Sequence, residues 1–75
     1  MNIIFDNKKI GESIEKNREK KGFTRKDFKN VLKINSTKTI YNWENGLCIP
    51  NLSNLVKICN FLEVKIEAVL FYKVI

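Results

Sequence analysis

The sequence contains no histidine and only two cysteines, Cys48 and Cys59. The cysteines lie eleven residues apart with no C-x-x-C spacing, so the usual zinc-binding and thiol-redox patterns are absent. The chain also lacks a glycine-rich phosphate loop and a compact cluster of carboxylates. These absences argue against an enzyme, and we expect neither a metal nor another cofactor. We interpret both cysteines as reduced, small packing residues, with a disulfide or a reactive thiol as the alternative.

No apolar run approaches the ~18 residues of a membrane-spanning helix. The start of the chain, MNIIFDNKK, lacks the basic region that begins a signal peptide. A helix lying on a membrane surface would need a broad exposed apolar face, whereas the apolar faces here are needed to build a core. We therefore expect a cytoplasmic protein with no membrane partner.

A length of 75 residues predicts a single domain of modest stability, which a partner subunit would help to stabilise. Such a domain has no room for a ligand pocket of ordinary size beside its core, so no small-molecule ligand is expected. The net charge is +6, and residues 1–50 hold eleven basic and six acidic side chains while residues 51–75 hold three and two. This positive field attracts polyanions, and nucleic acid, an anionic membrane surface and an acidic protein are the alternatives.

Two helices are predicted in the first half of the chain. Apolar positions recur every fourth residue between Asp6 and Lys21, at Ile10, Ile14 and the stem of Arg18, before Gly22 ends the pattern. The second helix begins at a capping box. Thr24 supplies the N-cap hydroxyl, Asp27 follows three residues later, and Phe23 and Phe28 occupy the positions of a hydrophobic staple. Its expected apolar face is Phe28, Val31 and Leu32, and it should end near Lys33 or Ile34.

Three further helices are predicted in the second half. Ser36 is a good N-cap for a third helix, with Ile40 and Trp43 pointing inward and Gly46 at its end. Asn51 caps a fourth helix. The apolar positions of that fourth helix are Leu52, Leu55, Val56, Cys59 and Leu62, and those of a short fifth helix are Ile66, Val69 and Leu70.

The two ends of the chain are rich in aromatic and β-branched residues. Ile3–Phe5 and Phe71–Ile75 are therefore candidates for short strands. The pattern leaves three alternatives open: the strands pair with each other, they pair across a dimer, or the segments pack as extended tails.

Short helices capped at Thr24 and Ser36, with a turn of three or four residues between them, match the geometry of a DNA-binding helix-turn-helix. The segment TIYNWENGLCIP followed by NLSNLVKICNFLEV closely resembles the phage Cro and repressor family of helix-turn-helix domains. In that family a W-E-x-G-x-x-x-P stretch ends the recognition helix. The residues that reproduce it here are Trp43, Glu44, Gly46 and Pro50.

The resemblance runs from about Lys8 to Leu70 and implies an all-α domain of five helices in this repressor-type arrangement. One departure concerns the turn. The family usually has a glycine after the last leucine of the second helix, whereas this chain has Lys33, and its turn is one residue longer at about Asn35. Because asparagine tolerates a positive φ better than most residues, we expect the turn to be rebuilt around Asn35.

The outward face of the third helix is the candidate base-reading surface. If Ile40 and Trp43 face the core, the opposite side holds Thr37, Lys38, Tyr41 and Asn42. The resembled family also places its base-reading side chains there. A lysine can donate to guanine, an asparagine can pair with adenine, and Thr37 and Tyr41 can touch a thymine methyl or a phosphate. The alternative is a merely solvated helix surface.

Phosphate contacts are expected at both ends of the motif. Thr24 and Arg25 begin the second helix, whose N-terminus points at the DNA backbone in this motif, and Lys26 follows them. Asn45 and the amides of residues 46–48 are candidates on the other side, with a plain helix C-cap as the alternative for Asn45. The resemblance further implies a structural ion pair between Arg18 and Glu44, and Trp43 is expected in the core.

The resemblance implies a sequence-specific regulator of transcription that binds double-stranded DNA, acting as a repressor by occupying an operator. As a homodimer it would bind a roughly palindromic operator with half-sites about 34 Å apart. The hydrophobic tail Phe71–Ile75 is the first candidate for the contact between subunits. The rival hypothesis is a protein-interaction module of the same fold, such as an antirepressor or antitoxin, whose recognition face tends to be acidic or apolar.

Overall fold

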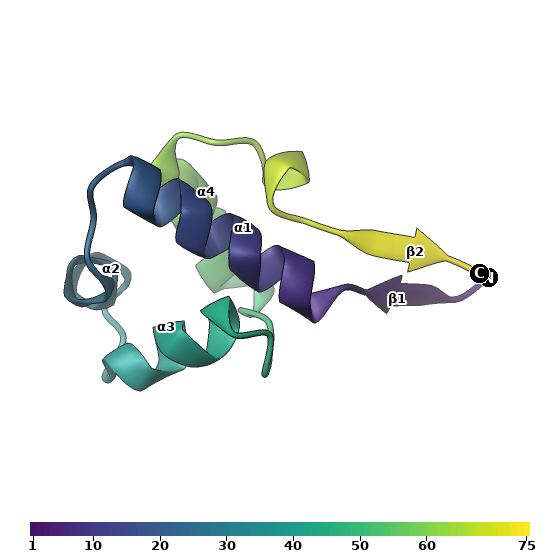
Figure 1. Cartoon of the computed structure of the whole chain (residues 1–75), viewed down its shortest axis with the longest axis horizontal. Coiled ribbons are helices and arrows are strands. Elements are labelled where there is room, and N and C mark those ends of the chain that lie inside the picture. Colours follow the sequence, from purple (N-terminus) through teal and green to yellow (C-terminus); the bar gives the residue numbers. More distant parts are fainter.

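The computed structural model describes all 75 residues. Four α-helices and one turn of 3₁₀-helix lie between two short strands that come together from opposite ends of the chain (Figure 1). In order, the elements are β1 (Ile3–Phe5), α1 (Asn7–Lys20), α2 (Arg25–Leu32), α3 (Thr37–Glu44), α4 (Leu52–Leu62), η1 (Ile66–Ala68) and β2 (Tyr72–Val74). No helix has the length and apolar character needed to cross a membrane.

The prediction of five α-helices is wrong at the last element. Residues 66–68 form only a single 3₁₀ turn, η1. Lys65 precedes this turn and supplies no side-chain cap, and the chain straightens into β2 a few residues later. Three residues without a cap cannot sustain an α-helix, because the first helical turn fixes several residues for one hydrogen bond.

The predicted helix starts are confirmed. The N-cap side chains of α2, α3 and α4 accept hydrogen bonds from backbone amides two or three residues ahead, at 2.8–3.1 Å. These caps are Thr24, Ser36 and Asn51. At α2 the capping box is complete, since the amide of Thr24 also donates to the carboxylate of Asp27 at 2.9 Å. Each cap satisfies backbone donors that the helix itself leaves free.

The turn between α2 and α3 is built on Lys33 and not on Asn35. Lys33 is left-handed, with a φ of +55°, and Asn35 does not have a positive φ. The amide of Lys33 donates to the carbonyl of Asn30 and the amide of Ile34 to that of Lys29. This pair of bonds closes the end of α2 and requires the left-handed residue immediately after the helix, where the family usually has glycine.

Replacing Lys33 by glycine should therefore raise the free energy of unfolding by about 1 kcal/mol, because glycine reaches this conformation without a Cβ clash. In a domain of this size, 1 kcal/mol corresponds to a rise in Tm of roughly 4–8 °C, which circular dichroism would detect. Lys33→Ala is the matched control, since it removes the charge but keeps the Cβ. An equal rise in both variants would assign the effect to charge and not to backbone strain.

Eleven apolar residues form the core. They are Ile10, Ile14, Phe28, Leu32, Ile40, Trp43, Leu55, Ile58, Cys59, Leu62 and Val69. Three residues predicted on inward faces are instead exposed: Val31, Leu52 and Val56. In α4 the buried positions are 55, 58, 59 and 62, the spacing of a single helical stripe. This stripe includes Ile58, and it leaves Leu52 and Val56 outside.

The cysteines are both free, and only one of them is a packing residue. Cys59 is buried, and this burial, assisted by Glu67, raises the pKa of its thiol. Cys48 is exposed in the loop after α3, so its expected role in packing is wrong.

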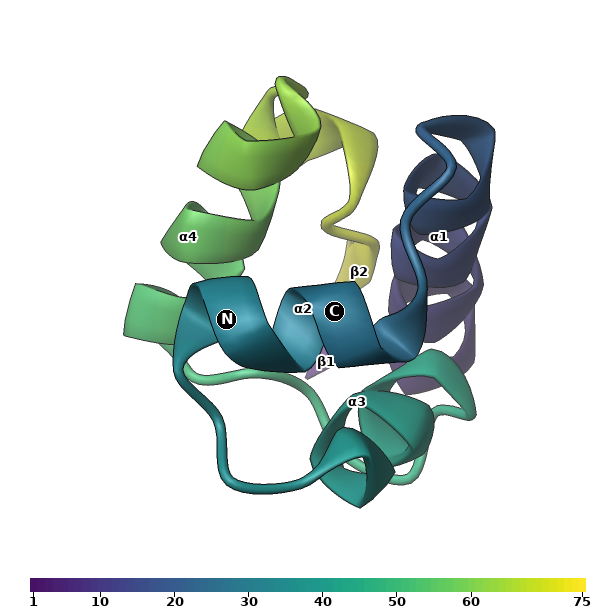
Figure 2. The same ribbon diagram turned by 90° about the vertical axis from the view of Figure 1, so that its left-hand side faces the viewer.

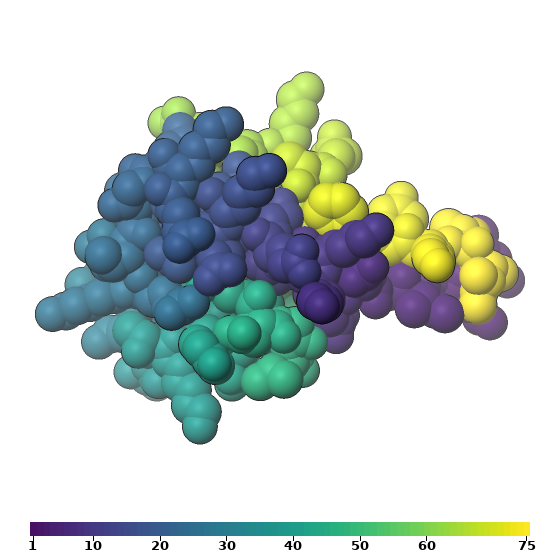
Figure 3. All heavy atoms as spheres, viewed as in Figure 1, coloured from purple at the N-terminus to yellow at the C-terminus, as the bar shows by residue number.

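β1 and β2 form an antiparallel two-stranded ribbon within one chain. Ile3 pairs with Val74, Ile4 with Lys73, and Phe5 with Tyr72. Two hydrogen bonds of 2.8 Å between Asn2 and Ile75 extend this pairing. Of the three alternatives for the ends of the chain, the structure therefore shows strands that pair with each other. The ribbon projects beyond the helices, and in the space-filling view it forms a narrow extension of the globular part (Figures 1 and 3).

The helices form a compact cluster at the other end of the long axis. Viewed from that end, α2 lies in front, α3 lies below it, and α1 and α4 stand on either side (Figure 2). Three aromatic rings join α4 to α2 and to the residues before it: Phe61 packs against Phe23 and Phe28, with ring centroids 4.4 and 5.7 Å away. The helix-turn-helix pair thus rests on α1 and α4 and leaves one side of α3 uncovered.

Candidate nucleic-acid interface

α3 divides into a core face and an open face. Ile40 and Trp43 are buried, as predicted. On the other side of the helix, Thr37, Lys38 and Tyr41 are exposed. The fourth predicted base-reading residue, Asn42, is half-buried. The structure therefore brings the four side chains to one helix, with three of them exposed.

Beneath this surface, Glu44 is held by two arginines. Its side chain is 0% exposed and accepts hydrogen bonds from Arg18 at 2.7 and 3.2 Å, and from Arg25 at 2.8 Å. A further guanidinium nitrogen of Arg18 donates to the carbonyl of Phe23 at 2.7 Å. Arg18 and Glu44 thus form the ion pair between α1 and α3 that the family resemblance implied. No polar side-chain atom that is buried in this structure lacks a partner.

Arg25 has a structural role that the sequence did not indicate. In addition to Glu44, it binds Glu15 of α1 at 3.1 Å, and its guanidinium lies 5.3 Å from the centre of the Tyr41 ring. The hydrogen bond that Arg25 donates to Glu44 raises the pKa of Arg25, with burial acting in the opposite direction. Arg25 therefore joins α1, α2 and α3 at one point and restrains an aromatic side chain on the open face.

The other candidate phosphate ligands differ in whether their polar groups already have partners within the protein. Thr24 is engaged in the capping box through both its hydroxyl and its amide. Lys26 is exposed and makes no ion pair. The side-chain amide of Asn45 donates to the carbonyl of Tyr41 at 2.8 Å, which is the helix C-cap expected as the alternative. Contact with phosphate at these residues stays a prediction.

α1 approaches α3 so closely that only glycine fits at the crossing. A Cβ built on Gly11 would lie 2.2 Å from the carbonyl oxygen of Trp43 and 2.7 Å from that of Glu44. Gly46, with a φ of +75°, similarly lies against the backbone of Lys8, where a Cβ would come within 2.9 Å. These contacts set the position of α3 on its support.

Gly11 and Glu15 are the two residues of this site that the sequence interpretation missed. Glycine in the middle of a helical pattern was the available signal for the first, because it costs helix stability and needs a packing reason. The pairing of Glu15 with Arg25 crosses between helices, so no spacing along the chain reveals it.

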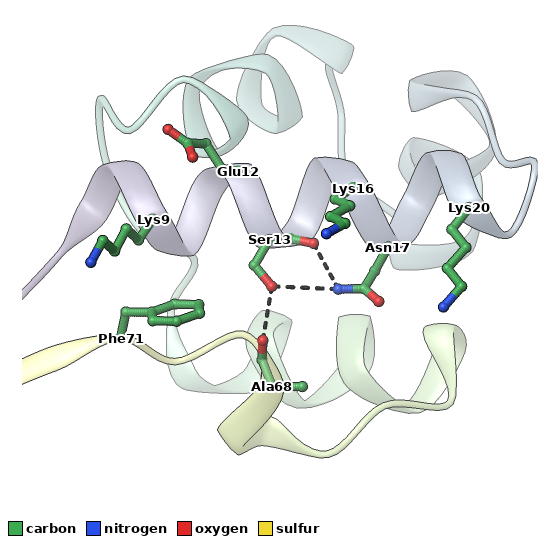
Figure 4. A pocket seen from close by; sticks show the side chains of 8 residues that line it. All are labelled: Lys9, Glu12, Ser13, Lys16, Asn17, Lys20, Ala68 and Phe71. Carbon is green, nitrogen blue, oxygen red and sulfur yellow. Dashed lines mark hydrogen bonds between the residues drawn. The ribbon is translucent and has the colours of Figure 1, made fainter.

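A surface groove of about 510 Å³ lies on the side of α1 away from α3 (Figure 4). Three lysines stand along it: Lys9, Lys16 and Lys20. Inside, Ser13 donates to the carbonyl of Ala68 at 2.9 Å, and the side-chain amide of Asn17 donates to the carbonyl of Ser13 at 2.8 Å. The first bond fastens η1 to α1 and the second lies within α1, so these polar groups of the groove have a structural use.

Comparison with known proteins agrees with this geometry. A helix-turn-helix family model matches residues 14–69. The fold is similar to that of the restriction-modification controller protein C.AhdI from Aeromonas hydrophila, with a TM-score of 0.76. That similarity covers 85% of this chain and 96% of the other at 19% sequence identity, a level that supports the fold alone. A search of curated proteins produced no match. Since the family model spans most of the chain, this protein belongs to the helix-turn-helix family and is a DNA-binding transcription regulator of the Cro and repressor type.

Proposed function

We propose that the protein is a sequence-specific repressor that inserts α3 into the major groove of an operator. The observation that carries this proposal is the open face of α3, which is polar and basic with no acidic residue among Thr37, Lys38, Tyr41 and Asn42. An α-helix fits the major groove of B-DNA, where each base pair presents its own pattern of donors and acceptors.

Lys38 and Asn42 are assigned the base contacts. They lie four residues apart, one helical turn, so both side chains point to the same strip of groove. Lys38 donates to guanine O6 or N7, and Asn42 forms the paired donor and acceptor contact that suits adenine. Each good contact of the paired kind discriminates against a wrong base by roughly 1–3 kcal/mol.

Tyr41 and Thr37 complete the contact surface. The Tyr41 ring is restrained by Arg25 before DNA arrives, so little side-chain freedom remains to be lost on binding. From this position the ring meets a thymine methyl or a sugar and phosphate. Thr37, in the first turn of α3, takes the same kind of contact at the other end of the face.

The N-terminus of α2 supplies the phosphate contact. The capping box uses the amides of Thr24 and Asp27, which leaves those of Arg25 and Lys26 available. Backbone amides at a helix start bind phosphate, and Lys26 adds a mobile positive charge. Arg25 contributes through its remaining exposed guanidinium edge while it holds Glu44 and Glu15. Asn45, beyond the other end of the open face, is assigned a phosphate on the opposite side.

A homodimer on a palindromic operator provides the specificity that one short helix lacks. Two copies of α3, placed about 34 Å apart, read half-sites separated by one turn of DNA. Repression then follows from occupancy, because polymerase and dimer compete for the same stretch of DNA. A restriction-modification controller protein shares this fold, and a regulatory role of this kind is extended to the present chain as part of the proposal.

The test is selection from a pool of random duplex DNA at two salt concentrations, with sequencing of the bound fraction. Wild-type protein should enrich paired half-sites, with an affinity that falls steeply as salt rises. Lys38→Ala and Asn42→Ala should each change or weaken the preference at one position of the half-site, because each loses one base contact.

Two exposed residues remote from α3 in sequence provide matched controls for these substitutions. Lys65→Ala removes the same charge as Lys38→Ala, and Asn60→Ala the same amide as Asn42→Ala. Both controls should select the wild-type sequence. Folded wild-type protein that enriches no sequence would refute groove reading and favour the rival, a protein-interaction module of this fold.

A further inference from the structure

Arg25 covers part of an exposed aromatic ring on the open face of α3. Its guanidinium carbon lies over the Tyr41 ring, 5.3 Å from the ring centre. Tyr41 is nevertheless 49% exposed, so the part of the ring that Arg25 does not cover is accessible to a partner. A cation over an aromatic ring is attracted by the ring electrons, and this attraction restrains both side chains.

Two carboxylates determine where this guanidinium lies. Glu44 of α3 accepts a hydrogen bond from Nε of Arg25 at 2.8 Å, and Glu15 of α1 accepts one from Nη2 at 3.1 Å. A planar group that is held through one nitrogen can pivot about that bond, whereas bonds to two different nitrogens fix its plane. Glu15 therefore supplies the second restraint on Arg25.

The two carboxylates have different structural importance. The side chain of Glu44 is fully buried and also binds Arg18, so it is needed for the packing of α3 on α1. The side chain of Glu15 is 37% exposed, and Arg25 is its one partner. An ion pair that is this exposed contributes little to the stability of the fold. What Glu15 mainly affects is the position of Arg25 beside Tyr41.

We propose that Glu15 is a specificity-determining residue, although it belongs to α1 and lies outside the open face of α3. It is a positioning residue that acts through Arg25. With Glu15 in place, the guanidinium stays against one side of the Tyr41 ring, and the ring presents its other side to the C5 methyl group of a thymine. The contact with DNA rests on the proposed function, whereas the restraint of Tyr41 by Glu15 does not.

A restrained ring suits recognition of a methyl group. Of the four bases, only thymine carries a methyl group in the major groove, and proteins recognise it by apolar contact. Such a contact has no hydrogen bond to give it direction, so discrimination depends on where the ring lies. A ring that samples several positions before binding must lose that freedom on binding, which weakens the contact.

NMR spectroscopy of the free protein tests the restraint without DNA. Wild-type protein should show nuclear Overhauser effects between the side chain of Arg25 and the ring of Tyr41. Glu15→Ala should lose most of their intensity while circular dichroism stays unchanged. Glu12→Ala is the matched control, because it removes the same group from an exposed position of α1 that forms no ion pair. Effects of full intensity in Glu15→Ala would overturn the proposal.

Replacement of thymine by uracil, one position at a time in the duplex that the wild-type protein selects, tests the methyl contact. The wild-type protein should lose about fourfold in affinity at one position of each half-site, the effect of burying one methyl-sized group. Glu15→Ala should lose less than about twofold there, because the ring is no longer held against the methyl group. It should keep the base preferences assigned to Lys38 and Asn42. A purely structural role of Glu15 would instead weaken binding to every duplex equally.

Tyr41→Phe separates the ring from its hydroxyl group. This variant should keep the sensitivity of the wild-type protein to uracil, because it retains the ring. Loss of that sensitivity would assign the contact to the hydroxyl group and overturn the proposal. Equal responses of Glu15→Ala and Glu12→Ala to uracil would also overturn it.

Failure of this inference is distinguishable from failure of the proposed function. If wild-type protein discriminates between bases at the positions assigned to Lys38 and Asn42 but tolerates uracil everywhere, the thymine contact is refuted and the proposed function stands. If folded wild-type protein discriminates between no bases at all, the proposed function is refuted and the thymine contact with it.

Discussion

Replacing Gly11 by alanine is expected to lower the free energy of unfolding by about 2 kcal/mol or more and to abolish specific DNA binding. The added Cβ would lie 2.2 Å from the carbonyl oxygen of Trp43, and neither α1 nor α3 can yield locally because the contact is with backbone. Overpacking of this kind costs ~3 kcal/mol, and the better helix propensity of alanine offsets only ~1 kcal/mol of it. Thermal unfolding should show a fall in Tm of roughly 10 °C or more.

Gly22→Ala separates this steric effect from backbone conformation. Gly22 has a φ of +79°, and no atom lies within 4 Å of the position that a Cβ would take, so its substitution strains the backbone without a clash. It should cost ~1 kcal/mol and leave the DNA sequence preference unchanged. If Gly11→Ala were as stable as the native protein, the tight crossing of α1 and α3 would be refuted.

Glu44→Gln should have the largest effect of any substitution at the site. The buried carboxylate neutralises Arg18 and Arg25 together, and an amide leaves the buried guanidinium of Arg18 without a countercharge and that of Arg25 with Glu15 alone. Stranding a buried charge in this way costs about 3–5 kcal/mol. Denaturant unfolding would measure the loss, and much of a domain this small should be unfolded at physiological temperature.

Glu15→Gln is the matched control for Glu44→Gln. It breaks the other ion pair of Arg25, but Glu15 has a side chain that is 37% exposed and solvent replaces its interaction. Such pairs contribute up to ~1 kcal/mol. Comparable losses from the two substitutions would show that the network is a surface feature and that Glu44 does not anchor α3.

The helix starts and the open face of α3 were predictable because their causes are local. The side chains of Thr24, Ser36 and Asn51 accept hydrogen bonds from backbone amides only two or three residues ahead. Each cap can therefore be recognised from a few neighbouring residues of the sequence. The division of α3 into a core face and an open face likewise follows from the spacing of Ile40 and Trp43.

The remaining features depend on contacts that are distant in sequence. Gly11 is needed because α3 crosses α1 at that point, and Glu15 meets Arg25 only after three helices have assembled. Lys33 at positive φ was missed because asparagine is the more tolerant residue, yet hydrogen bonding at the end of α2 determines the position.

The conformation of residues 66–75 also depends on contacts that are distant in sequence. The pattern of Ile66, Val69 and Leu70 suited a helix, but Leu70 packs only at the edge of the core and the chain must leave in the direction of β1. Pairing between the two ends of the chain thus competes with a fifth helix. Periodicity describes which side of a segment is apolar and does not determine where the segment must go.

The most direct test of α3 insertion is to remove major-groove atoms from the selected duplex one at a time. Replacing guanine or adenine by its 7-deaza analogue deletes the N7 acceptor that Lys38 and Asn42 are assigned to read. For each of the two residues, one such deletion should weaken DNA binding by the wild-type protein. The same deletion should have little further effect on DNA binding by the variant that already lacks that contact, Lys38→Ala or Asn42→Ala. If every 7-deaza substitution is tolerated, or weakens wild type and variants equally, α3 does not read the major groove through these residues.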